Sequence, residues 1–219
     1  MPRGPTDRTK IRRHPERASY DRKTVDAILD EALLCHVAFA VDGHPSVIPT
    51  IHVRVGDELY IHGSQASRTL RALNSGMEVC IEVTLLDGIV LARSTPKHSM
   101  NYRSVVLYGS AHPITDPTEK HEAQLALVEH ILPGRAASVR PPNAAEMKET
   151  LILAIPLDEA SAKIRSGPPL DPEADLTVPT WAGVLPLALT LGDPQPDARQ
   201  SPDIPPPDYA HRYRRSPSV

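Results

Sequence analysis

The sequence lacks several features that would each define a class of protein. No apolar run approaches the ~20 residues needed to cross a bilayer, and the first residues, Met1 to Gly4, show no hydrophobic segment typical of a secretory signal. There is no excess of basic charge either, since 24 Lys and Arg against 27 Asp and Glu give a formal charge of −3. We therefore expect a cytoplasmic protein that binds neither membranes nor nucleic acid.

Cysteine is scarce, and the two present, Cys35 and Cys80, lie in apolar runs typical of strands. No Cys-x-x-Cys pair occurs, so neither a disulfide framework nor a zinc site is expected. The sequence also lacks a Gly-x-Gly-x-x-Gly motif, a Walker motif and any regular alternation of strands with helices. A nucleotide-binding fold with a parallel sheet is therefore not predicted.

Proline is plentiful but unevenly placed, because twelve of the 24 prolines lie between Pro168 and Pro217. Proline interrupts helices and sheet ladders, so we expect the folded domain to span residues 21–165. A basic arm, residues 1–20, precedes it. Two Pro-rich pieces follow it, residues 166–190 and a flexible tail over residues 191–219.

The folded part reads as one helix followed by short strands. Apolar residues at helical spacing predict a helix that is capped by Asp21 or Thr24 and ends near Leu34. Runs that are apolar or alternate in polarity predict strands at residues 35–41, 46–55, 59–62, 79–83, 89–93, 102–114 and 151–155, the last of the series.

Local signals predict the turns and the remaining helices. Asp42-Gly43 and Asp87-Gly88 are typical of hairpin turns. Asp116 and Asn143, each followed three residues later by Glu, predict two helix starts. The expected fold is therefore mainly β with peripheral helices, in which six or so antiparallel strands form a barrel.

The segment from Gly63 to Arg68 is the most informative for function. A strand ends there in a small turn, and a short helix over residues 67–74 begins at Ser67. Free N–H groups at a helix start favour an anion, and Ser64, Ser67 and Arg68 could each donate to a phosphate. An ordinary helix cap with a surface arginine is the alternative.

Two further segments could line a ligand. Pro49 lies within a strand, where it cannot donate to the ladder, so a flat ring could lie against this position. Residues 98–105 place several hydrogen-bonding side chains where a loop enters a strand. An edge strand without a ligand and a solvated strand entry are the respective alternatives.

Five segments together resemble the FMN-binding split β-barrel family, which includes the pyridoxamine 5′-phosphate oxidases and the nitroimidazole-resistance flavoproteins. The resemblance covers roughly residues 9–186 and is closest to the branch described only as pyridoxamine oxidase-like or flavin-nucleotide-binding. It is specific for the family and not for a reaction. The segments are residues 12–18 (RRHPERA), 47–50 (VIPT), 59–68 (LYIHGSQASR), 98–105 (HSMNYRSV) and 181–186 (WAGVLP).

The resemblance implies FMN as the cofactor and a homodimer as the assembly. In the family, the strand that matches residues 47–50 lies along the isoalloxazine ring. The turn that matches residues 63–68 holds the phosphate. The strand that matches residues 101–104 completes the site from the same or the neighbouring chain. Residues 166–190 would pack at the flavin and the dimer interface. The implied cofactor-binding residues are Pro49, Thr50, His62, Gly63, Ser64, Ser67, Arg68, Asn101, Tyr102, Arg103, Ser104 and Trp181.

Two positions bear on the reaction. Thr69 stands where true pyridoxamine phosphate oxidases commonly carry lysine, and no basic set for a second phosphate is visible. Oxidation of pyridoxamine phosphate is therefore not expected. His62 matches a position where nitroimidazole-resistance relatives tend to carry a histidine near the flavin, and it is the single candidate catalytic residue.

Three functions are compatible with these residues. The first is an FMN-dependent oxidoreductase that uses a reduced nicotinamide to reduce a small aromatic, nitro or quinone-like acceptor. The second is a flavin store or sensor without turnover. The third is a split barrel that binds haem or a deazaflavin instead. Histidines on the predicted strands, such as His36, His52, His62 and His112, make haem conceivable, although none has the spacing of a metal-ligand pair.

Overall fold

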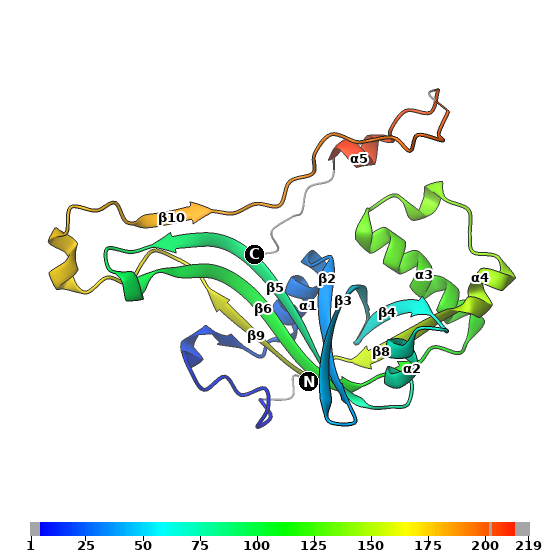
Figure 1. Cartoon of the computed structure of the whole chain (residues 1–219), viewed down its shortest axis with the longest axis horizontal. Coiled ribbons are helices and arrows are strands. Elements are labelled where there is room, and N and C mark those ends of the chain that lie inside the picture. The colour runs from blue at the N-terminus through cyan, green and yellow to red at the C-terminus, as the bar shows by residue number, and fades with distance from the viewer. Residues whose placement is uncertain (1–4, 202, 213–219) are drawn as a thin grey trace.

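The computed structural model describes residues 5–201 and 203–212, in which ten strands form one bent antiparallel sheet (Figure 1). The strand order is β1-β9-β6-β5-β2-β3-β4-β8-β7, β10 pairs with β5, and the sheet does not close on itself. The mainly β split-barrel fold expected from the sequence is confirmed. The strands are β1 Ala18–Ser19, β2 Leu34–Val41, β3 His44–Val55, β4 Glu58–Ser64, β5 Glu78–Leu91, β6 Ser99–Ser110, β7 His112–Pro113, β8 Thr150–Pro156, β9 Glu159–Arg165 and β10 Gly183–Pro186.

The helices begin at the capping residues that the sequence indicated. Asp21 accepts a hydrogen bond from the backbone N–H of Thr24 at 3.0 Å, and Asp116 accepts two at 2.9 Å. Asn143 and Glu146 form a reciprocal capping box. The predicted helix starts are therefore confirmed. The helices are α1 Arg22–Glu31, α2 Arg68–Leu73, α3 Pro117–Ile131, α4 Ala144–Glu149 and α5 Asp208–Arg212.

The sheet buries apolar side chains on both of its faces around β4 and β8. Leu59 and Ile61 of β4 belong to the main core, which lies inside the bend with α1 and α2. Tyr60 of β4 and Ile152 of β8 face outward and pack with Ala123 and other side chains of α3. Helix α3 therefore covers the outer face of the sheet at β3, β4 and β8.

His52 of β3 is fully buried, although the alternation of β3 places it on the more polar face. Its Nε2 donates to the carbonyl of Leu29 at 3.0 Å, and its ring lies 5.3 Å from the ring of His130 on α3. Burial lowers the pKa of His52 from its usual 6.5 to about 4. This histidine is therefore a neutral core residue at neutral pH.

The predicted hairpin turn at Asp87-Gly88 is wrong, because β5 runs through it as one strand with a bulge against β6. Gly88 also pairs with Pro186 of β10, and a Cβ at Gly88 would lie 2.9 Å from Val184 Cγ1. Glycine at this position allows the close approach of β10 rather than a turn. By contrast, the hairpin at Asp42-Gly43 is confirmed, with φ of 52° and 77°.

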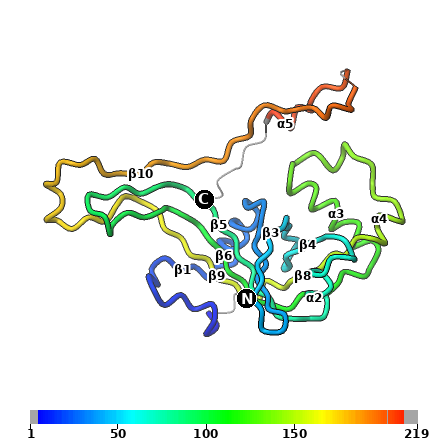
Figure 2. The backbone as a smooth tube through the Cα atoms, viewed as in Figure 1, coloured from blue at the N-terminus to red at the C-terminus, as the bar shows by residue number. Residues whose placement is uncertain are grey.

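The prediction that residues 151–155 form the last strand is also wrong, because β9 and β10 follow. Strands β5 and β6 extend beyond the bent sheet as a long ribbon, and β10 lies along it (Figure 2). The chain then crosses back toward α3 (Figure 1), where the Tyr209 hydroxyl accepts a hydrogen bond from Arg135 Nη1 at 3.1 Å.

The described part of the N-terminal arm is held by charge against the sheet, since Arg8 forms ion pairs with Glu78 and Glu159. The division of the chain into arm, domain, Pro-rich segment and tail stays a prediction. Residues 1–4 of the arm and residues 202 and 213–219 of the tail lie outside the described residues. In the described ranges, none of the helices combines the length and the apolar character that crossing a membrane requires.

We expect the burial of His52 to make stability depend on pH. The unfolded chain binds this proton more readily than the folded one, because the pKa is lower in the folded state. The free energy of unfolding should therefore fall as pH drops, by about 2 kcal/mol between pH 7 and pH 5 from this group. Urea denaturation of wild type and His52→Gln at both pH values measures this change in the free energy of unfolding.

His44→Gln is the matched control, because His44 lies on the same strand and is exposed. The control should keep the full pH dependence, whereas His52→Gln should lose its share. Equal pH dependence in all three proteins would contradict the assignment.

Candidate functional site

The predicted phosphate turn lies where β4 ends and α2 begins. Ser67 caps α2 by accepting a hydrogen bond from the N–H of Leu70 at 3.3 Å, and Ser64 Oγ accepts one from Ala66 at 3.1 Å. In both contacts the hydroxyl oxygen is the acceptor, so each hydroxyl keeps its own hydrogen to donate. Arg68 is exposed beside them. The turn therefore offers two hydroxyl donors and one cation on its outer side.

Gly63 leaves room for a core side chain beside this turn. A Cβ at Gly63 would lie 2.7 Å from Leu70 Cδ1, a buried side chain of α2. A larger residue would displace the Leu70 side chain from its place in the core.

Pro49 and Thr50 lie on β3 at the pairing with β2, where Pro49 faces His36 and Thr50 faces Cys35. The proline is in the strand and exposed, as expected for a residue that cannot donate to a ladder. Val47 nearby is 59 % exposed. The β2–β3 hairpin thus presents an open apolar surface beside the candidate ring position.

The predicted residues of β6 use their polar groups within the fold. Asn101 accepts a hydrogen bond from Arg165 and donates to the carbonyl of Gly167 at 3.2 Å. Ser104 Oγ donates to the carbonyl of Lys163 at 3.3 Å. Tyr102 is half-buried on the same strand and pairs with Arg165.

Arg103 is the centre of a charged cluster. Its guanidinium donates to both oxygens of Asp87, at 2.7 and 2.9 Å, and to Glu31 at the end of α1 at 2.9 Å. These carboxylates raise the pKa of Arg103. The Glu31 side chain is only 6 % exposed. The cluster connects the bulge of β5 to α1, so Arg103 has a structural role in this chain.

Trp181 is 62 % exposed just before β10 and lies over the backbone of Gly183, where a Cβ would come within 2.8 Å of the indole ring. The ribbon with β10 and the turn before α2 are at opposite ends of the molecule (Figure 1). One chain therefore does not bring Trp181 and Arg68 to the same site.

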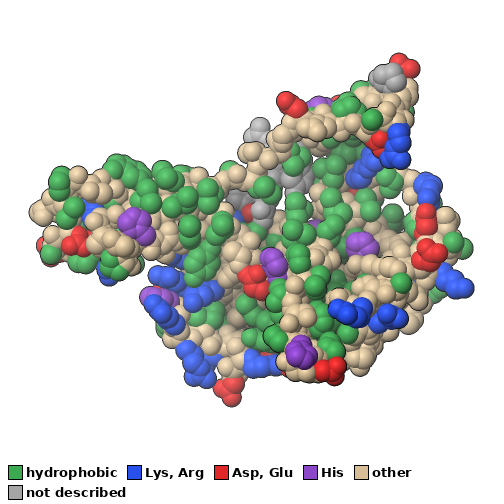
Figure 3. Space-filling model, viewed as in Figure 1, with side chains coloured by type: hydrophobic (Ala, Val, Ile, Leu, Met, Phe, Trp, Pro, Cys, Tyr) green, Lys and Arg blue, Asp and Glu red, His purple; other side chains and the backbone are tan. Residues whose placement is uncertain are grey.

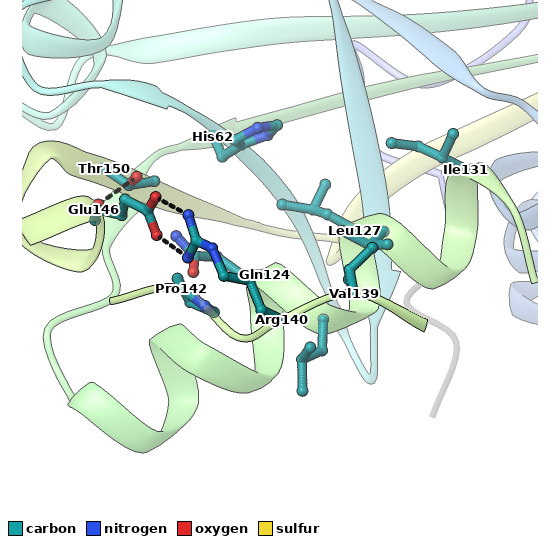
Figure 4. A pocket seen from close by; sticks show the side chains of 11 residues that line it. His62, Gln124, Leu127, Ile131, Val139, Arg140, Pro142, Glu146 and Thr150 are labelled. Atoms are coloured by element: carbon teal, nitrogen blue, oxygen red, sulfur yellow. Dashed lines mark hydrogen bonds and ion pairs between the residues drawn. The ribbon is translucent and has the colours of Figure 1, made fainter. Parts of the chain in front are cut away.

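A cavity of about 440 Å³ lies between the outer face of β4, helix α3 and the segment that leads into α4 (Figure 4). His62 of β4 lines it from the sheet side. It faces outward because it shares the face of Tyr60, two residues earlier. Side chains of α3 and of the following segment line the other sides, namely Gln124, Leu125, Leu127, Val128, Ile131, Val139, Arg140, Pro142, Glu146 and Thr150.

Some polar groups of the cavity have hydrogen-bond partners and others have none in the described part of the chain. Arg140 forms a bidentate ion pair with Glu146, at 2.8 and 2.5 Å. In contrast, the Nδ1 of His62 and the Oε1 of Gln124 are buried without a hydrogen-bond partner in the described part of the chain. Burial lowers the pKa of His62, so its imidazole is neutral at neutral pH.

Sequence reasoning selected His62 but missed the remaining cavity residues. They come from α3, from the segment after it and from α4, and only the packing of these elements on the sheet brings them to His62. The capping signals at Asp116 and Asn143 predicted the helices but not the face of the sheet that they cover.

The sequence pattern of the pyridoxamine 5′-phosphate oxidase family matches residues 21–164. The chain belongs to this family, and the resemblance inferred from the sequence is confirmed. None of the curated proteins compared matches the chain.

Two solved structures match almost the whole chain. The flavocytochrome Anf3 of Azotobacter vinelandii is 42 % identical, with a TM-score of 0.89, over 96 % of this chain and 98 % of that protein. An FAD- and haem-binding protein of Mycobacterium smegmatis is 38 % identical, with a TM-score of 0.86, over 90 % and 97 %.

A protein of Bacteroides thetaiotaomicron described as a 5-nitroimidazole antibiotic resistance protein is 22 % identical, with a TM-score of 0.57, over 67 % and 86 %. At this identity the likeness concerns the fold alone. The family and the two nearly full-length matches together support a flavin-binding protein.

We expect Arg103→Gln to destabilise the protein without removing its ligand site. The substitution removes the guanidinium that pairs with both Asp87 and Glu31, which should lower the free energy of unfolding by about 3 kcal/mol. Chemical denaturation followed by circular dichroism measures this change.

Arg71→Gln serves as the control, because Arg71 is exposed on α2, and it should change stability little. If Arg103→Gln were as stable as this control but had lost its flavin, Arg103 would be a cofactor ligand and the structural role would be wrong.

Proposed function

We propose that this chain is a flavin-dependent oxidoreductase that also binds haem and acts as a homodimer. The observation that carries the proposal is the similarity, at 42 % and 38 % identity, to a flavocytochrome and to an FAD- and haem-binding protein. Coverage of 96 % of this chain extends the first match well beyond the family segment that ends at residue 164. The ribbon partner β10 and much of the tail therefore belong to the shared structure.

The flavin is proposed to be held at its phosphate end by the turn before α2. The Ser64 and Ser67 hydroxyls have hydrogens to donate, and Arg68 is exposed to pair with an anion. Pro49 and Thr50 would line the ring. The sequence favours FMN, whereas the name of the Mycobacterium smegmatis relative favours FAD.

The bound groups would supply the redox chemistry, with the flavin able to exchange two electrons and haem one. The residues of the chain would bind and orient them and limit access of water. A reduced nicotinamide is the proposed electron source, and a small aromatic, nitro or quinone-like molecule the proposed acceptor. Oxidation of NADH or NADPH with such an acceptor separates this function from a flavin sensor without turnover.

The homodimer is proposed because the candidate flavin residues fall into two groups that are far apart in one chain. Asn101, Tyr102 and Trp181 lie on the ribbon, whereas the phosphate turn lies on the far side of the bent sheet. Hydrophobic side chains gather on the ribbon and around the hollow beneath the tail (Figure 3), and Val47 and Trp181 are both exposed. A second copy would cover these surfaces and bring its ribbon to the flavin of the first.

We expect the purified protein to retain a flavin that depends on the turn before α2. Mass spectrometry of the ligand released on denaturation identifies FMN or FAD. The double variant Ser67→Ala, Arg68→Ala removes charge-assisted donors, so flavin affinity should fall by roughly 10- to 100-fold. Fluorescence titration of the apoprotein measures the affinity.

The control double variant is Arg71→Ala, Ser75→Ala, which removes the same residue types at the other end of α2. Its flavin affinity should equal that of wild type. A colourless wild-type protein that takes up neither FMN nor FAD would refute the proposed flavin site.

We expect the protein to be a dimer that Val47→Asp weakens. A carboxylate on the exposed apolar hairpin would be desolvated at the proposed interface, so light scattering should show a shift toward monomer, together with weaker flavin retention. Val55→Asp is the matched control, because Val55 is exposed at the other end of β3, and it should leave the dimer intact. A wild-type monomer that binds flavin tightly would contradict the proposal.

A further inference from the structure

The cavity over β4 has the size and lining of a site for a large apolar group. Its volume of about 440 Å³ is within the range of small-molecule sites, roughly 300–1,000 Å³. Leu127 and Ile131 of α3 and Val139 of the following segment form an apolar wall across from His62 (Figure 4), and Val128 of α3 also lines the cavity. The cavity lies on the outer face of the sheet, on the α3 side of β4.

The charged side chains of this cavity already have partners. Arg140 is held by both carboxylate oxygens of Glu146, and the Thr150 hydroxyl donates to the carbonyl of Glu146 at 2.8 Å. A phosphate would meet a neutralised cation and an adjacent carboxylate here, which disfavours it. The cavity therefore does not suit the phosphate end of a flavin.

The His62 side chain differs from those of buried His52 and half-buried His130 in its hydrogen bonding. His52 donates to the carbonyl of Leu29 at 3.0 Å, and His130 donates to the carbonyl of Ala32 at 2.8 Å. The backbone of His62 is part of the β4–β8 ladder, but in the described ranges the Nδ1 of its side chain is buried without a hydrogen-bond partner. It is the one histidine that lines the cavity. A neutral imidazole without a partner beside an apolar wall is a free nitrogen ligand.

We propose that this cavity is the haem site of the chain and that the imidazole of His62 is an axial ligand of the haem iron. The inference rests on the haem binding proposed above. A flat apolar macrocycle needs apolar walls on its faces and a nitrogen ligand at its iron, and this cavity combines Leu127, Val128 and Ile131 with one unpaired imidazole.

The test is a titration of the full-length protein with hemin, followed by the Soret band and by electron paramagnetic resonance. Wild type should bind one haem per chain with the spectrum of a histidine ligand. His62→Ala should lower haem affinity by roughly tenfold or more and change the iron signals. Added imidazole should restore them, because it can take the place of the missing side chain. His62→Gln should show the same loss while keeping the size and polarity of the residue.

Two further variants make the outcome decisive. His36→Ala removes an exposed strand histidine and should bind haem as wild type does. Val128→Trp fills the cavity without touching His62 and should also lose haem. In every variant, an unchanged circular dichroism spectrum shows that the fold is intact.

The possible failures are distinguishable. If wild type binds haem and both His62 variants give the same Soret maximum and resonance signals as wild type, the ligand assignment is overturned while the proposed function stands. If His62→Ala loses haem but Val128→Trp does not, haem lies outside this cavity. If wild type binds flavin but no haem, the haem part of the proposed function fails together with this inference.

Discussion

The bent sheet has to bury apolar side chains on both of its faces around β4 and β8, and the arrangement of the rest depends on this requirement. The inner face is filled by the main core with α1 and α2. The outer face needs a cover, which α3 provides through Ala123 and Leu127. Because α3 packs on the sheet with one side only, the space beyond it toward α4 remains as a cavity. Two-sided burial thus creates both the stability of the centre and the place where a ligand can lie.

The long β5–β6 ribbon depends on a different interaction. A bulge at Asp87 would leave a carboxylate beside a backbone irregularity, and Arg103 satisfies it while also pairing with Glu31 on α1. The ribbon is thereby fixed to the body of the molecule at one end. Gly88 lets β10 approach closely, because a Cβ there would lie 2.9 Å from Val184 Cγ1 and 3.2 Å from the carbonyl oxygen of Leu185. The same few residues set the direction of the ribbon and the place where the Pro-rich segment docks.

Most of the fold could be predicted where the signal was local. Asp116 and Asn143 specified helix starts because capping is decided within four residues, and Asp42-Gly43 specified a hairpin because both residues tolerate positive φ. Strand β9 was not predicted, because Ala160 and Ala162 have a low preference for strands. Only the pairing of this segment with β6 defines it as a strand. Gly88 was predicted to lie in a turn, because the sequence does not show that β10 packs on it. The cavity could not be predicted for the same reason, since His62 and Ile131 meet only through the packing of α3.

The segment between β10 and α5 is attached to the body at both of its ends, by the ladder with β5 and by the contact of Tyr209 with Arg135. A chain that is fixed at two points samples far fewer conformations than a free end of equal length. Covering a bound molecule or a neighbouring subunit with it would therefore require less loss of conformational entropy. In this respect the Pro-rich end of the chain is a preorganised strap, and its prolines stiffen it further by fixing φ.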